Sequence, residues 1–185
     1  MKIVYLAWGS LVWSPENLAI AKENPWLYSN LKLPLEYSRI SDNKKGRLTL
    51  VIDPKNGTLN KVWYSYSLLN NINDSIKSLR LREKTTINNI GFINLKNNKS
   101  RYNIYNNNNI NYINNIKNWM TIKKIDVAIW TNLSPNWEYS INKAYNYFLN
   151  SDLETRLKQL EYIYKATNFN YIKTEFSNYF FKNLR

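Results

Sequence analysis

The first apolar segment of the chain, residues 2–7 (Lys-Ile-Val-Tyr-Leu-Ala), is rich in β-branched and aromatic side chains and predicts a strand. It is followed by Trp8-Gly9-Ser10-Leu11, which contains the only glycine among the first 45 residues. A lone glycine directly after a strand marks a turn, or a place where the backbone closely approaches another group. We therefore expect a tight turn at the end of the first strand.

Three further segments are rich in alternating or β-branched residues and are separated by short turns. They predict consecutive antiparallel strands at 35–41, 47–52 and 61–67. In the first of them, Glu36 should point away from the core because Leu35 and Tyr37 point inward. The stretch framed by Pro25 and Pro34 is expected to be irregular.

Later in the chain the pattern changes from strands to helices. A short helix is predicted at about 74–83, and strands are predicted at 90–95 and 125–131. Between these two strands we expect an Asn-rich loop at about 97–109 and then a helix that ends near 121. From about 140 the periodicity is helical, with a last amphipathic segment at 174–182. Strands first and helices late predict one α+β domain over residues 1–185, with a helical C-terminal part.

The composition narrows the chemistry that a site could use. The 185 residues include no cysteine and no histidine. Disulfides, zinc–thiolate and iron–sulfur centres, cysteine nucleophiles, Ser–His–Asp triads and histidine-ligated metals are therefore excluded. Acid–base chemistry would come from a carboxylate, a lysine, a tyrosine or the backbone, and we expect no metal site.

The net charge is +13, from 26 Lys and Arg against 13 Asp and Glu. Such a charge is typical of proteins that bind nucleic acid or an anionic membrane surface. Here the basic residues are scattered, and no Lys/Arg–aromatic stripe or nucleic-acid-binding motif is visible along the chain. Asn, Ile, Lys and Tyr share AT-rich codons, so genome composition would produce this charge without selection for it. We therefore favour a partner other than nucleic acid.

The N-terminal segment has to be compared with a signal peptide. A signal peptide has a basic region, an apolar region and a cleavage site with small residues, which would correspond to Lys2, Ile3–Trp13 and Ala19-Ile20-Ala21. Pro15 and Glu16 interrupt this pattern. We favour a buried strand, and with it a cytoplasmic protein. No apolar run approaches the roughly 18 residues that a spanning helix needs, so we expect no membrane association.

Glu83 and the glycine turn are the two candidates for chemistry. Glu83 ends the predicted short helix, in Leu79-Arg80-Leu81-Arg82-Glu83-Lys84. By itself it could be an exposed glutamate paired with Arg80 and Lys84, which is worth under about 1 kcal/mol. The N–H groups of the Gly9-Ser10-Leu11 turn could form an anion-binding nest, although an ordinary turn would also explain that segment.

Taken together, these segments resemble the gamma-glutamylcyclotransferase-like family. The family's N-terminal motif has the core aromatic-Gly-Ser-Leu. It resembles the segment Tyr5-Leu6-Ala7-Trp8-Gly9-Ser10-Leu11-Val12-Trp13-Ser14-Pro15, which looks most like bacterial members that carry Trp-Gly-Ser-Leu. Three later segments resemble the family in the same order, so the similarity reaches from residue 3 to about 137. They are residues 35–41 with 47–53, Leu81-Arg82-Glu83-Lys84, and residues 126–133.

The resemblance implies a small mixed or antiparallel, β-barrel-like sheet flanked by helices, and an enzyme without a cofactor. In the implied reaction, the α-amine of a γ-glutamyl group, as in glutathione, attacks its own γ-carbonyl and releases 5-oxoproline and a free amine or amino acid. Glu83 matches the family's acid/base glutamate. The loop whose backbone amides hold the substrate corresponds to Trp8, Gly9, Ser10 and Leu11.

Three features depart from the family pattern. The aromatic residue of the motif is usually tyrosine, and Trp8 lacks its hydroxyl. Arg80, Arg82 and Lys84 would stabilise the charged form of Glu83 if they pointed at it. Residues 85–89 replace the small residues that usually follow the glutamate.

Two other functions stay open. A relative that kept the fold but lost the chemistry would bind a small carboxylate at the same turn without turnover, and the departures at Trp8 and around Glu83 motivate this alternative. A basic module that binds nucleic acid or an acidic partner is motivated by the net charge alone. Neither the substrate within the γ-glutamyl class nor the oligomeric state follows from the sequence.

Overall fold

The computed structural model describes residues 1–41, 46–103 and 110–184. In this part of the chain, seven strands form one sheet with the order β3-β2-β4-β1-β7-β5-β6. The strands are β1 (Ile3–Ala7), β2 (Leu27–Ile40), β3 (Leu48–Ile52), β4 (Thr58–Tyr66), β5 (Ile90–Asn94), β6 (Lys99–Arg101) and β7 (Val127–Thr131). The helices are α1 (Ser10–Trp13), α3 (Ile72–Arg82), the 3-10 helix η1 (Ile87–Asn89), α4 (Ile110–Lys123), α5 (Ile141–Asn150), α6 (Leu153–Asn168) and α7 (Glu175–Asn183).

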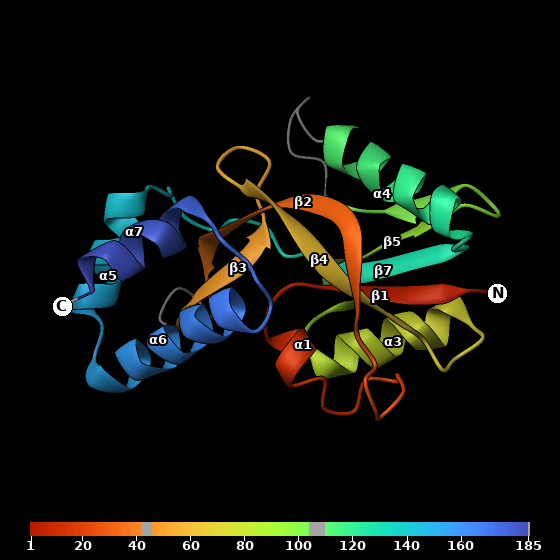
Figure 1. The fold of residues 1–185 in the computed structure, drawn as a ribbon. Coiled ribbons are helices and arrows are strands. Elements are labelled where there is room, and N and C mark those ends of the chain that lie inside the picture. The colour runs from red at the N-terminus through yellow and green to blue at the C-terminus, as the bar shows by residue number, and fades with distance from the viewer. Residues whose placement is uncertain (42–45, 104–109, 185) are drawn as a thin grey trace.

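The sheet is mixed. The central strand β1 pairs antiparallel with β4 and parallel with β7, and the other neighbouring strands are antiparallel. The predicted α+β class, with strands early and helices late, is confirmed. Within the described residues the sheet is curved but open, with β3 and β6 at its edges, and does not close into a barrel (Figure 1).

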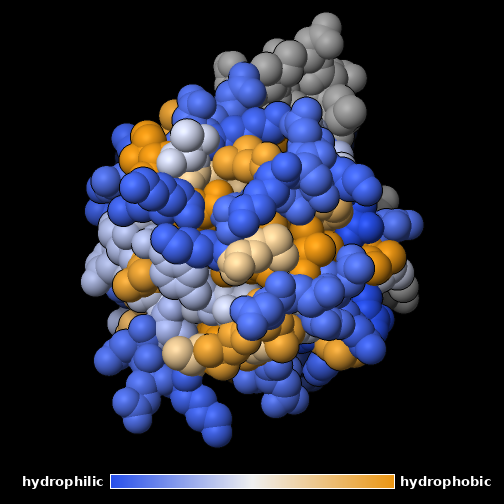
Figure 2. All heavy atoms as spheres, turned by 90° about the vertical axis from the view of Figure 1, so that its right-hand side faces the viewer, coloured by the Kyte–Doolittle hydropathy of each residue, from blue (hydrophilic) through white to orange (hydrophobic). Residues whose placement is uncertain are grey.

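Helices cover both faces of the sheet. Figure 1 shows α4 above it, α3 and α1 below it, and α5, α6 and α7 together at the end that carries β3. All five residues of β1 are buried, because Val4 and Leu6 join the cluster that reaches α4 and α7 while Ile3, Tyr5 and Ala7 join the cluster on α3. At the end of the molecule with the N-terminus and α4, the surface shows several separate apolar patches among hydrophilic residues (Figure 2).

Local pattern predicted most elements, with shifted ends. The helix predicted at about 74–83 begins at Ile72, because the side chain of Asn71 caps it by accepting hydrogen bonds from the amides of Asn73 and Asp74. Helices are present from residue 141 onward as predicted, and α7 covers the last amphipathic segment.

Two predictions about irregular segments were wrong in part. The stretch framed by Pro25 and Pro34 is strand from Leu27, because bulges let β2 bend while it pairs with both β3 and β4. The predicted Asn-rich loop at 97–109 contains β6, which pairs with β5. Its residues 104–109 lie outside the described residues.

The prediction for Glu36 was also wrong. Its side chain is fully buried, as are those of its neighbours Leu35 and Tyr37. One carboxyl oxygen accepts a hydrogen bond from the Tyr37 amide at 2.8 Å, and the other accepts one from the Phe176 amide in the first turn of α7 at 3.4 Å. The C-terminal helices therefore cover the face of β2 that alternation alone assigns to solvent.

We searched the described helices for candidate membrane spans, and none is both long and apolar enough to qualify.

Candidate active site

The turn after β1 is built around Gly9. The glycine has a φ of −115°, outside the left-handed region, so its close contacts and not a positive φ explain the glycine here. A Cβ atom at this position would lie 2.4 Å from the hydroxyl oxygen of Tyr162 on α6. The close approach expected from a lone glycine after a strand is thus present, and its partner is Tyr162.

Three side-chain hydrogen bonds fix this turn. The side-chain amide of the fully buried Asn170 donates to the carbonyl oxygens of Trp8 at 2.9 Å and Gly9 at 3.1 Å. The indole of Trp8 donates to the carbonyl oxygen of Leu50 at 3.3 Å. The amides of Ser10 and Leu11 stand at the start of α1, where N–H groups have no acceptor within the helix. The turn therefore presents backbone donors while its carbonyl groups are occupied.

Glu83 is placed by the end of α3. It is the C-terminal cap of this helix, and its amide donates to the carbonyl of Leu79 at 2.9 Å. The chain leaves the helical path at Lys84, which has a positive φ of 48°. The Glu83 side chain is 17% exposed.

Arg82 connects Glu83 to α1. Its guanidinium forms an ion pair with Oε1 of Glu83 and donates twice to the carbonyl oxygen of Ser14, at 3.1 and 2.6 Å. A longer contact of 3.4 Å reaches the Ser10 hydroxyl. Of the three basic neighbours of Glu83, only Arg82 forms an ion pair with it in the described part of the chain. Within the described residues, no hydrogen bond is donated to Oε2 of Glu83. This second carboxylate oxygen is therefore open to a ligand.

A cavity of about 60 Å³ lies between these groups. Its wall includes Trp8, Gly9, Ser10, Leu11 and Glu83, so all five residues singled out from the sequence meet here. Opposite walls come from β3, from Thr131 and Leu133, and from Tyr162. The space exceeds the roughly 10–15 Å³ that a cavity needs to hold a water molecule, so small polar groups of a ligand can enter it.

Tyr162 supplies a neutral hydroxyl beside the turn. Burial raises the pKa of Tyr162, and the Arg47 guanidinium, 4.6 Å from the centre of its ring, opposes this effect. The phenol therefore keeps its proton at neutral pH.

Sequence reasoning missed Tyr162 and Asn170. Both belong to the helical C-terminal part, to which the family resemblance gave little weight. Nothing in the local pattern separates Asn170 from the many other asparagines, and its role is visible only once α6 is packed against the turn. Arg82 was noted as a neighbour of Glu83, but its bonds to α1 were not foreseen.

Within the described ranges, no group of three or more Asp and Glu residues is placed to hold a metal ion. Comparisons with protein families, with curated proteins and with solved structures give no match for the chain.

Proposed function

We propose that the protein is a gamma-glutamylcyclotransferase-like enzyme, which converts a γ-glutamyl amide into 5-oxoproline and a free amine or amino acid. One observation carries the proposal: Glu83 and the turn at Trp8, Gly9, Ser10 and Leu11 line the same small cavity, although more than 70 residues separate them in the chain. The reaction needs a base, an acid and hydrogen-bond donors, and this cavity contains them without cysteine or histidine.

The backbone donors suit the negative groups of the substrate. The amides of Ser10 and Leu11 would bind the α-carboxylate or the oxyanion that forms when the γ-carbonyl is attacked. Asn170 and Gly9 keep the turn in this conformation, so the donors are arranged before the substrate arrives.

Glu83 acts first as a base and then as an acid. Its open oxygen accepts a proton from the α-ammonium group, and the resulting amine attacks the γ-carbonyl to form the lactam C–N bond. The protonated glutamic acid then donates that proton to the departing amine as the original amide bond breaks. The ring nitrogen loses its second proton to the regenerated Glu83 carboxylate, which passes it to the released amine or to solvent, so that the lactam and a free ammonium group leave the site. Because amine and carbonyl belong to one molecule, holding them close supplies much of the rate.

Arg82 is a positioning residue in this scheme. By holding Oε1 and the carbonyl of Ser14 together, it fixes the Glu83 carboxylate relative to the turn. We further propose that the enzyme uses no cofactor and acts in the cytoplasm on a small γ-glutamyl compound. The burial of Ile3–Ala7 as the central strand argues against its being a cleaved signal peptide, because this segment is part of the core.

A second candidate is a protein that binds a small carboxylate without turnover. The observation that favours it is the ion pair itself, because Arg82 occupies one oxygen of the carboxylate that would have to move protons. Both candidates use the same cavity and differ only in chemistry.

The test is release of 5-oxoproline from a panel of γ-glutamyl amines and dipeptides, glutathione included. We expect turnover by the wild type and a loss of roughly 100- to 10,000-fold in Glu83→Gln, the usual contribution of general acid–base catalysis. Glu154→Gln is the matched control, since Glu154 is exposed on α6 and pairs with Lys158. Absence of product with every compound, together with calorimetric binding of one of them, would favour the second candidate.

A further inference from the structure

A strip of aromatic and basic side chains lies on the outer face of β2 and β4, outside the cavity. On β4 the outward residues alternate as Leu59, Lys61 and Trp63. Across the ladder, Tyr28 pairs with Trp63, and Lys32 pairs with Lys61. An aromatic pair is thus followed by a lysine pair along one face of the two strands.

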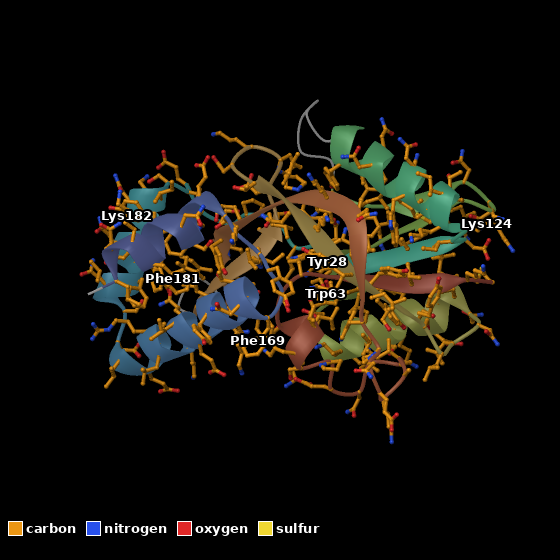
Figure 3. The ribbon with its side chains drawn as sticks, viewed as in Figure 1. Tyr28, Trp63, Lys124, Phe169, Phe181 and Lys182 are labelled. Atoms are coloured by element: carbon orange, nitrogen blue, oxygen red, sulfur yellow. The ribbon has the colours of Figure 1, made fainter. Side chains whose placement is uncertain are left out.

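Tyr171 completes the aromatic part of the strip. Its ring lies 5.9 Å from that of Tyr28 and 6.4 Å from that of Trp63, and Tyr28 and Trp63 are 4.8 Å apart. Figure 3 shows Tyr28 and Trp63 together near the centre of the view. Tyr28 is 45% and Tyr171 is 60% exposed, so both side chains are accessible to a ligand.

The segment that carries Tyr171 is held along β4. The indole of Trp63 donates to the carbonyl of Asn170 at 3.3 Å. The Asn60 side chain exchanges hydrogen bonds with the backbone of Lys173, at 3.1 and 2.8 Å. Lys173, which is exposed, follows Tyr171 by two residues in this segment.

Cross-strand pairing in the sheet does not explain the lysines on β2 and β4. Lys32 and Lys61 are directly opposite each other, and like charges in that position destabilise a sheet. In the described part of the chain, neither they nor Lys173 form an ion pair. The Lys61 ammonium lies 5.6 Å from the centre of the Tyr28 ring, so charge and ring are presented together. A negatively charged ligand with flat rings would satisfy both features.

We propose that this aromatic–lysine strip binds single-stranded nucleic acid, with bases stacked on the rings and phosphates beside the lysines. It consists of Tyr28, Lys32, Lys61, Trp63, Tyr171 and Lys173. Stacking on aromatic rings combined with a basic surface is the general mode of single-strand recognition. The strip is invisible along the sequence because three separate segments contribute to it. Binding at this face is independent of the Glu83 cavity.

The test is fluorescence anisotropy with a labelled oligothymidylate of about 15 nucleotides, at several salt concentrations. We expect Tyr28→Leu to weaken binding by roughly 5- to 150-fold, the usual effect of losing one stacked base. Lys61→Gln should reduce the slope of log affinity against log salt by about 0.7, as expected for one phosphate contact on a single strand. A duplex of the same length should compete poorly, because its base faces are already stacked.

Matched controls lie at the end of the molecule that carries α7. Phe181→Leu and Lys182→Gln remove an exposed ring and an exposed charge from α7, at the left of Figure 3, and should bind as the wild type does. The proposal is overturned if Lys182→Gln weakens binding as much as Lys61→Gln, because the effect is then diffuse charge. It is also overturned if the folded Tyr28→Leu and Lys61→Gln variants bind normally, or if the strip binds anionic phospholipid vesicles and no oligonucleotide.

Discussion

Glu36 lies where β2 meets the first turn of α7, and we predict that its replacement by glutamine changes how stability depends on pH. Burial raises the pKa of this carboxyl from 4.5 to about 7, although hydrogen bonds from the Tyr37 amide, the Thr174 side chain and the Phe176 amide oppose the rise. Between these two pH values, the folded protein holds a proton that the unfolded chain has lost.

The magnitude follows from the two pKa values. At about 1.4 kcal/mol for each unit, the rise from 4.5 to about 7 corresponds to about 3 kcal/mol. This contribution to the free energy of unfolding is fully present below pH 4.5 and is lost as the pH rises through about 7, because the native state then has to hold a buried charge.

The assay is urea unfolding followed by tryptophan fluorescence, between about pH 4 and pH 8, for the wild type and Glu36→Gln. Glutamine does not titrate, so the difference in unfolding free energy between the two proteins should shift by about 3 kcal/mol in favour of the variant as the pH rises. Glu154→Gln, at an exposed site, should show no shift in that direction. A difference that stays constant over this range would refute the reasoning.

Two predictions concern the turn. Gly9→Ala should lower the free energy of unfolding by about 1–3 kcal/mol in urea titrations, because its Cβ overlaps the Tyr162 hydroxyl. Adding Tyr162→Phe should restore most of this loss, and equal stability of Gly9→Ala and wild type would contradict the packing. Asn170→Ala should cost about 1–3 kcal/mol, because the buried Trp8 carbonyl loses its donor and the Gly9 carbonyl keeps only the Val12 amide. It should also reduce 5-oxoproline release measured where the variant is still folded, and unchanged turnover would remove Asn170 from the site.

Features that depend on neighbouring residues could be predicted from the sequence. β1 was evident from its β-branched and aromatic residues, and the glycine after it indicated a close approach. The placement of Glu83 at a helix end was also local, since Arg82 and Glu83 follow an amphipathic turn. These features placed the two halves of the site on separate elements, but only the family resemblance joined them.

Features that depend on residues distant in the chain could not be predicted. Alternation placed Glu36 in solvent, because α7, which covers it, begins about 140 residues later. Tyr162 and Asn170 reach the turn only when α6 has docked. The aromatic–lysine strip likewise requires the register between β2 and β4, including the bulge between Tyr28 and Lys32 that aligns the two lysines.

The central claim is that the cavity at Glu83 performs intramolecular aminolysis, and product analysis tests it most directly. Each γ-glutamyl compound of the panel is incubated with wild-type protein beside its α-N-acetylated analogue, and 5-oxoproline, glutamate and the released amine are quantified. The account predicts that 5-oxoproline and amine appear in equal amounts from the free-amine compound only, since the acetylated amine cannot attack. Release of glutamate in place of 5-oxoproline, or no release from any compound, would contradict it.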